Sequence, residues 1–148
     1  MKADLFYISR QVEFSAAHRL YREDWSEAKN RDRFGECANP HGHGHNYLLE
    51  VTLKGGVDEE TGMVAHFSQV KQLLHELVVA PLDHRHLNYD VPFLEGTLPT
   101  SENLVRKLWE RIAEASNGEG WSLHRLCLQS TSRNSVEYFG PPTQKESI

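Results

Sequence analysis

Three histidines stand at alternate positions in the segment CANPHGHGHNYLLEV, which spans residues 37–51 and begins with Cys37. Side chains two residues apart on a β-strand point the same way and lie about 7 Å apart along the chain, so two such imidazoles could bind one metal ion. Three neutral imidazoles suit zinc and leave a fourth position for water or substrate. A polar loop that leads into a half-buried strand would also explain the pattern.

Two predicted strands would bring the imidazoles together. In the segment 5–20 apolar side chains alternate along one face, and His18 takes a later position of that face. From 41 to 53 the order is reversed, because imidazoles come first and apolar side chains follow. We therefore expect His18 to meet His43 and His45 where two neighbouring strands, each buried on one side, lie together.

Two helices are predicted after these strands. Apolar residues fall at helical spacing over 69–80 and again over 102–115. Ser68 is suited to cap the first helix, and Thr100 or Ser101 the second, because their hydroxyls can accept hydrogen bonds from the first free amides.

Strand patterns return near the end of the chain, at 122–130 and 135–140. Residues 1–140 are expected to form a single domain, and 141–148 a flexible tail. The order β-β-α-α-β-β predicts an α+β fold, in which an antiparallel four-stranded sheet carries both helices on one face.

The composition indicates a soluble globular protein. The chain has 148 residues, a net charge of -5 and a pI of about 6.0, so it offers no basic surface for nucleic acid. No apolar run approaches the roughly 20 residues of a membrane span, and the first residues lack the apolar core of a signal peptide. We expect a cytoplasmic protein whose two cysteines are free thiols.

Six motifs follow one another along the chain: FSAAHRL, FGECANPHGHGHNY, TGMV, PLDHRHLNYDVPFL, PTSEN and RNSVEY. In their order and spacing, and over nearly its whole length, the chain resembles the 6-pyruvoyl-tetrahydropterin synthases and the related 6-carboxytetrahydropterin synthases of the queuosine pathway. The resemblance implies a T-fold (tunnelling fold) whose trimers form barrels and pair into a homohexamer, with active sites at subunit interfaces. It also implies a lyase reaction, in which 7,8-dihydroneopterin triphosphate loses triphosphate and its side chain rearranges.

The resemblance assigns roles by position. His18, His43 and His45 correspond to the zinc ligands, Cys37 to the catalytic cysteine, and the pair Asp83 and His84 to the acid-base residues. The segment contains two H-G-H strings, but the following asparagine and tyrosine and the distance from the cysteine favour the second. The first histidine of the segment, at position 41, is then a loop residue.

The substrate-binding residues implied by the resemblance match the family less completely than the metal ligands do. Thr100, Ser101 and Glu102 correspond to residues beside the pterin, although the same three residues also fit a capped helix start. Ser130 stands where the family has a glutamate that accepts two N–H bonds from the pterin, and we expect Glu102 to take over this anchor. The cations that could bind the triphosphate follow His18 in one loop: Arg19, Arg22, Lys29, Arg31 and Arg33. The same loop also holds four acidic residues.

Two other classes of function stay open. A pterin- or purine-binding protein without turnover is favoured by Ser130 and opposed by the intact Cys37, Asp83 and His84. A protein whose zinc only braces the fold would need a fourth protein ligand, such as Cys37 or His41. The residues leave open whether an enzyme would release the 6-pyruvoyl or the 6-carboxy product.

Overall fold

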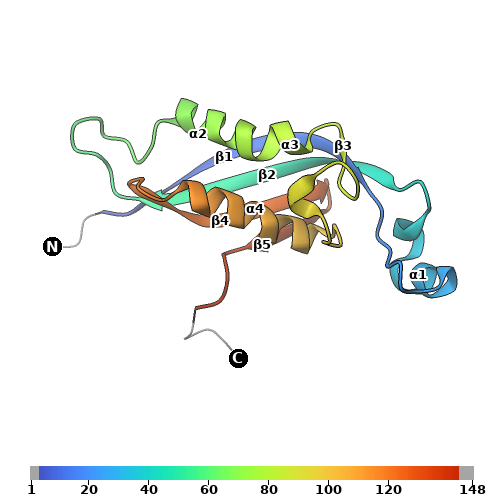
Figure 1. Cartoon of the computed structure of the whole chain (residues 1–148). Coiled ribbons are helices and arrows are strands. Elements are labelled where there is room, and N and C mark those ends of the chain that lie inside the picture. The colour runs from blue at the N-terminus through green and yellow to red at the C-terminus, as the bar shows by residue number, and fades with distance from the viewer. Residues whose placement is uncertain (1–3, 144–148) are drawn as a thin grey trace.

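The computed structural model describes residues 4–143, and these form one sheet with helices packed against it (Figure 1). The strand order is β3-β1-β2-β4-β5. Neighbouring strands are antiparallel except β3, which pairs in parallel with the end of β1. The strands are β1 (Phe6–His18), β2 (His43–Gly55), β3 (Arg85–His86), β4 (Trp121–Thr131) and β5 (Asn134–Tyr138).

The connections between the strands are mostly helical. The helices and helical turns are α1 (Glu27–Phe34), the 3-10 turn η1 (Gly35–Ala38), α2 (Phe67–Leu74), the π-helical turn η2 (His75–Val79), α3 (Ala80–Leu82), the 3-10 turn η3 (Pro92–Leu94) and α4 (Ser101–Ala115). α1 projects beyond the end of the sheet, whereas α2 and α4 run along it (Figure 1).

The hydrophobic core lies between one face of the sheet and the helices α2 and α4. Leu49 and Val51 of β2 are fully buried at its centre, and Leu126 and Leu128 lie beside them on β4. Each fully buried aliphatic side chain stabilises the fold by about 1.5–3 kcal/mol relative to an exposed one. The helices contribute Val70, Leu74, Leu104, Leu108 and Ile112 to the same cluster.

The pairing of β1 with β2 explains how the sheet brings the histidines together. The register places His18 opposite His43 and Ala16 opposite His45. All these side chains belong to the face that buries Phe14 further along β1. The predicted meeting of imidazoles at the shared end of two strands is therefore confirmed.

The expected sheet of four antiparallel strands was wrong in its strand count. The fifth strand, β3, has two residues and pairs only with Ala16 and Ala17, so no alternation of side chains could reveal it. The α+β class and the placement of the two long helices on one face are as expected.

Two helical predictions also need correction. The segment 27–34, expected to be a loop, forms α1, whose first turn is capped by the hydroxyl of Ser26. α2 begins two residues before the predicted start, because the ring of His66 accepts the amide of Ser68 and caps the helix in place of the serine. The predicted cap of α4 is confirmed, since the Thr100 hydroxyl accepts the Asn103 amide.

The other face of the sheet is polar and has ordered side-chain contacts. Ser9 bonds Thr52 at 2.8 Å, and the guanidinium of Arg125 bridges Glu50 and Glu137. β5 and most of β1 form the edges of the sheet within the described residues.

The predicted tail at 141–148 is only partly observed. Residues 141–143 belong to no helix or strand, and residues 144–148 lie outside the described part of the chain. Among the described helices, none has both the length and the apolar character that a membrane crossing requires.

Candidate metal centre and active site

Three imidazoles converge at the end of β1 and the start of β2. The Nε2 atom of His43 lies 3.0 Å from Nε2 of His18 and 2.9 Å from Nε2 of His45. One ring nitrogen from each residue lies within 4.8 Å of the other two. Neutral imidazole nitrogens with their lone pairs directed at one point would repel each other unless a proton or a cation lies between them. The arrangement is that of a metal site with three histidine ligands.

His18 is held in the form that a metal requires. Its side chain is buried, and its Nδ1–H donates to the carbonyl of Pro99 at 2.8 Å, which leaves Nε2 free to bind. Burial is the main cause that lowers the pKa of His18 to about 4, although the bond to Pro99 acts against it. The ring is therefore neutral near pH 7, and no proton has to leave before a metal binds.

The other ligands lie in a more open setting. Burial lowers the pKa of His45, and the neighbouring His43 lowers it further. Tyr47 supports these rings from the core side, with its ring centroid 5.4 Å from that of His45 and 5.0 Å from that of Phe14. The ligand set thus stands on packed strand residues rather than on a loop.

A carboxylate and an imidazole form a second polar pair close to the metal ligands. Nδ1 of His84 lies 2.9 Å from Oδ2 of Asp83, and Oδ1 of Asp83 accepts the backbone amide of Ser15 at 2.8 Å. The bond from Ser15 is the main cause that lowers the pKa of Asp83, so this side chain is a carboxylate at neutral pH. The carboxylate fixes the tautomer of His84 with the proton on Nδ1.

The backbone places this pair with some strain. His84 has φ of 62°, an uncommon value for a residue with a side chain, and its amide donates to the Ser15 carbonyl. Its ring remains largely exposed, at 84% of the side-chain surface. Strained and exposed imidazoles of this kind occur at functional sites.

A pocket of about 490 Å³ is lined by His84 and by one of the three convergent histidines. Its walls include the metal ligand His45, the acid-base candidate His84, and Asn46 from β2. His86 and Asp90 complete one side of the pocket. Of the three convergent histidines, only His45 belongs to this lining, together with Ser15, Ala17 and Gly44 of β1 and β2.

Cys37 lies in η1, half-buried, as a free thiol. Its carbonyl accepts the amide of Leu20 at 2.8 Å, which ties this turn to the segment after His18. A charge on Cys37 would add to burial in raising the pKa of Tyr47, so the thiol lies within electrostatic range of the tyrosine beneath the metal ligands. Among the described residues, the group of convergent ligand atoms includes neither Cys37 nor His41.

The predicted pterin residues at the start of α4 lie beside the metal centre. The Pro99 carbonyl that holds His18 is followed directly by Thr100, the cap of the helix. Ser101 is half-buried and Glu102 is exposed in the first turn. The same segment therefore orients a metal ligand and carries an exposed carboxylate in the first turn of α4.

Ser130 lies near the end of β4, where the pairing with β5 is irregular between Gln129 and Thr131. It is half-buried. Gln129 pairs with Leu48, which alternates with the buried Tyr47 and Leu49 and so belongs to the opposite face. As expected, Gln129 therefore points away from the core side.

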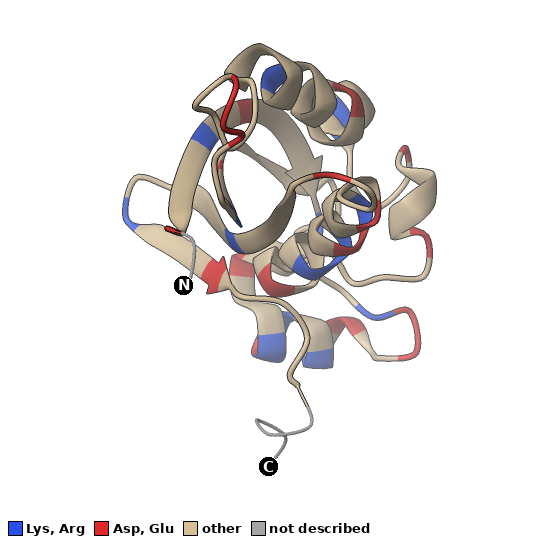
Figure 2. Cartoon of the chain, turned by 90° about the vertical axis from the view of Figure 1, so that its left-hand side faces the viewer, with Lys and Arg blue, Asp and Glu red and all other residues tan. Residues whose placement is uncertain are grey.

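Three of the cations predicted to bind the triphosphate surround an aromatic ring. The cationic groups of Arg22, Lys29 and Arg33 surround the ring of Trp25, at 5.1, 4.3 and 5.8 Å from its centroid. Arg19 donates to the Ala38 carbonyl. Figure 2 shows basic and acidic residues interspersed along the chain rather than separated by sign.

Several supporting residues had no distinct signal in the sequence. Pro99 and Ser15 act through backbone atoms, which any residue could supply. Gly42 has φ of 72°, and a Cβ there would lie 2.6 Å from the His18 carbonyl, so the turn before His43 requires glycine.

Comparison with known proteins extends these observations. The chain is 40% identical over 135 residues to the 6-pyruvoyl tetrahydrobiopterin synthase of Poecilia reticulata, with 90% of each chain covered. It is 33% identical over 140 residues to the 6-carboxy-5,6,7,8-tetrahydropterin synthase of Synechocystis sp., with 93% of this chain and 95% of the relative covered.

A solved structure agrees with the fold. The structure of Caenorhabditis elegans 6-pyruvoyl tetrahydropterin synthase superposes with a TM-score of 0.87 at 35% identity, covering 95% of this chain and 99% of that one. A family model described as 6-pyruvoyl tetrahydropterin synthase matches residues 7–141. The chain therefore belongs to the 6-pyruvoyl tetrahydropterin synthase family.

Proposed function

We propose that the protein is a zinc-dependent lyase that converts 7,8-dihydroneopterin triphosphate to 6-pyruvoyltetrahydropterin by eliminating triphosphate and rearranging the side chain. One observation carries the proposal: in a chain of the 6-pyruvoyl tetrahydropterin synthase family, one ring nitrogen from each of His18, His43 and His45 lies within 4.8 Å of the other two, and no fourth ligand joins them among the described residues. This arrangement leaves a coordination position open for a substrate.

The three-histidine site fits a catalytic zinc better than a structural one. Structural zinc is almost always held by four protein ligands, whereas catalytic zinc has three and an open position. Here the convergent group among the described residues contains only His18, His43 and His45. When bound, zinc would polarise the side-chain oxygens of the substrate and so acidify the adjacent C–H.

We assign the proton transfers to two residues. The thiol of Cys37, as thiolate, would remove the proton from the activated carbon. His84, held by Asp83 at 2.9 Å, would exchange protons through its exposed Nε2 at another position of the substrate. Asp83 itself would stay ionised and serve to orient the ring.

The pyruvoyl product is our first choice. The 6-pyruvoyl relative is 40% identical over 135 residues, and the 6-carboxy relative of the queuosine pathway is 33% identical over 140 residues. Conversion to 6-carboxytetrahydropterin remains the second candidate, since it begins with the same substrate.

The pterin would be anchored at the start of α4. Because Ser130 cannot supply a carboxylate, Glu102 is our candidate for accepting the N–H groups of the pterin, with Thr100 and Ser101 beside it. Its position supports this role, because the carbonyl of Pro99 in the same segment holds the metal ligand His18.

We further propose that the protein works as a cytoplasmic homohexamer of two barrel-forming trimers. The edges of the sheet at β1 and β5 can pair with other copies, and the exposed positions of His84 and Glu102 are suited to a site completed by a neighbouring subunit. Two free thiols suit a reducing compartment. Light scattering at micromolar concentration tests the assembly, and a clean monomer would contradict it.

The decisive experiment is to incubate the zinc-loaded protein with 7,8-dihydroneopterin triphosphate and identify the pterin by mass. We expect release of triphosphate and the mass of 6-pyruvoyltetrahydropterin. The mass of the 6-carboxy compound would select the second candidate. Binding of substrate without release of triphosphate would instead favour a pterin-binding protein.

A further inference from the structure

Ser15 of β1 is hydrogen-bonded to three residues of the candidate site. Its amide donates to Oδ1 of Asp83 at 2.8 Å, and its carbonyl accepts the amide of His84 at 2.6 Å. Its hydroxyl donates to Oδ1 of Asn46 at 2.6 Å, and the register pairs these two residues across β1 and β2. One residue of β1 therefore ties Asn46 to the acid-base pair.

The carboxamide of Asn46 is oriented by this contact but is not saturated. Because Oδ1 accepts the Ser15 hydroxyl, Nδ2 is the free end of the group and has two N–H bonds to donate. None of the described residues accepts a hydrogen bond from it. Asn46 lines the same pocket of about 490 Å³ as His84, so a bound molecule could accept one of these N–H groups.

His84 presents the complementary group in this pocket. Its Nδ1 carries the proton that it shares with Asp83 at 2.9 Å, so Nε2 has a free lone pair. A hydroxyl group can accept one hydrogen bond and donate another. The free N–H of Asn46 and the lone pair of His84 together suit a hydroxyl of a bound molecule.

The part of the pocket that the sheet forms has almost no side chains. Ala17 and Gly44 line it, and the register pairs these two residues across β1 and β2. A Cβ on Gly44 would lie 3.5 Å from the Ala16 carbonyl oxygen, which is an ordinary contact, so packing does not require glycine there. The missing side chain instead leaves the sheet open to a ligand.

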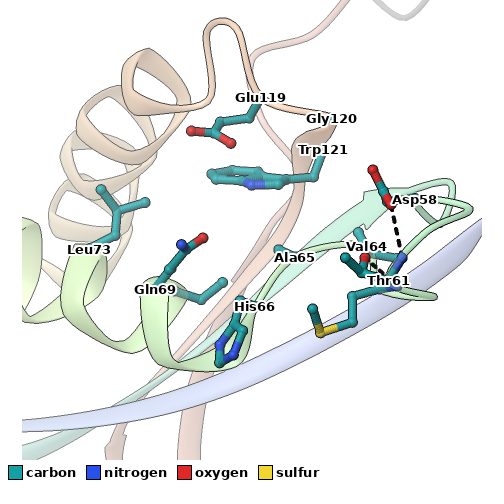
Figure 3. A pocket seen from close by; sticks show the side chains of 12 residues that line it. Asp58, Thr61, Val64, Ala65, His66, Gln69, Leu73, Glu119, Gly120 and Trp121 are labelled. Atoms are coloured by element: carbon teal, nitrogen blue, oxygen red, sulfur yellow. Dashed lines mark hydrogen bonds between the residues drawn. The ribbon is translucent and has the colours of Figure 1, made fainter.

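A larger pocket, of about 620 Å³, lies at the other end of the sheet (Figure 3). It adjoins the end of β2, where Gly55 lies against Trp121 of the pocket wall. Its carboxylate Asp58 serves the loop after β2, because Oδ1 accepts the amide of Thr61. An acid-base candidate with a free donor beside it is a feature of the smaller pocket.

We propose that Asn46 is a further substrate-binding residue, which donates from Nδ2 to a hydroxyl oxygen of the substrate while Nε2 of His84 accepts the proton of that hydroxyl. As the proton moves, the O–H bond breaks and an N–H bond forms at Nε2. The Asn46 amide stabilises the negative charge left on the oxygen, and Asp83 stabilises the imidazolium. This inference rests on the proposed lyase function, in which the side chain of 7,8-dihydroneopterin triphosphate supplies the hydroxyl.

The test changes Asn46 in the zinc-loaded full chain and measures triphosphate release and zinc content. Asn46→Asp keeps the acceptor for the Ser15 hydroxyl but has no N–H to donate, and Asn46→Ala removes the donor without adding charge. In both variants we expect kcat to fall about one hundredfold, as for the loss of one oxyanion donor, with a smaller change in KM and the same zinc content. The matched control is Asn117→Asp, an exposed amide after α4 and outside the pocket, which should keep the natural kcat.

Variants of two surrounding residues should have smaller effects. Ser15→Ala keeps both backbone contacts with the acid-base pair and loses only the hydroxyl that orients Asn46, so kcat should fall about tenfold or less. Gly44→Ala adds a methyl group to the pocket and should raise KM more than it lowers kcat. A larger loss of kcat in Ser15→Ala than in Asn46→Ala would overturn the proposal, because the donor would then not be the amide.

Calorimetry with the same substrate distinguishes this inference from the proposed function. If the natural protein binds 7,8-dihydroneopterin triphosphate without releasing triphosphate, the lyase proposal fails, and Asn46→Ala should still bind it about threefold or more weakly. Equal binding in that case, or release at the natural rate by both Asn46 variants, would overturn the inference. A metal-free Asn46→Ala protein would show that the residue supports His45 rather than the substrate. A natural protein that neither binds nor converts the substrate would overturn both proposals.

Discussion

Replacing His43 by alanine should remove the metal, because this residue is the centre of the ligand set. Its Nε2 lies 3.0 Å from that of His18 and 2.9 Å from that of His45, so its loss leaves two separated imidazoles. We expect zinc affinity to fall by about one hundredfold or more, a larger effect than the tenfold to hundredfold typical of residues that only support ligands. About one zinc per chain should fall to a small fraction after dialysis against a competing chelator.

The effect on stability can be estimated from linkage. With zinc at about one thousand times its dissociation constant, binding stabilises the folded chain by about 4 kcal/mol. A hundredfold weaker site leaves about 1.4 kcal/mol, a loss of roughly 2.7 kcal/mol. For a domain of this size that loss lowers Tm by about 5–10 °C, provided that unfolding is reversible.

The matched control is His41→Ala, which removes an exposed imidazole from the same segment. Its zinc content, measured by mass spectrometry, and its Tm should equal those of the natural protein. Adding a chelator should lower the Tm of the natural protein and of the control, and should change the His43→Ala protein little. A His41→Ala protein that loses zinc while His43→Ala retains it would refute the assignment of the ligands.

Two further predictions distinguish residues that take part in the reaction from residues that only hold the metal or the fold. Cys37→Ala should keep its zinc and its fold while turnover falls about one hundredfold or more, since the thiol is outside the convergent ligand group; a metal-free variant would indicate a structural zinc. Asp83→Asn should lower kcat about tenfold to one hundredfold with little change in zinc content, because the amide can still accept the Ser15 bond but no longer stabilises the charged ring of His84. An unchanged kcat in Asp83→Asn would argue against an acid-base role for the pair.

The metal centre could be predicted from the sequence because its geometry follows from strand alternation. A period of two fixes which side chains share a face, and the antiparallel register then brings His18 to His43. The core of α4 was predictable for the same kind of reason, since Leu104, Leu108 and Ile112 repeat at helical spacing.

Other features of the structure are not marked by any repeat of side chains along the sequence. β3 consists of two residues and forms because the chain after α3 passes the end of β1. This pairing depends on the tertiary structure rather than on a local sequence pattern. Three of the cations after His18 surround the ring of Trp25, and no pattern in the sequence indicated this contact. Backbone contacts such as Pro99 with His18 depend on the path of the chain rather than on residue type.

The most informative remaining question is how the pterin is held without the family's glutamate. A carboxylate that accepts two N–H groups forms charge-assisted bonds worth about 1.5–3 kcal/mol each, whereas a serine hydroxyl is shorter, uncharged and a weaker acceptor. Ser130 is half-buried beside an irregular part of β4, so the two pterin donors would be poorly paired there.

Glu102 offers a carboxylate in the segment that orients His18, and a site kept for chemistry needs an oriented substrate. We therefore expect measurable turnover in the natural protein and nearly complete loss in Glu102→Ala, with zinc content unchanged. Glu102→Asp, with its shorter side chain, should retain part of the activity. If Ser130→Glu instead gains about tenfold or more while Glu102→Ala changes nothing, Glu102 is not the anchor, and the natural ligand would be a molecule other than 7,8-dihydroneopterin triphosphate.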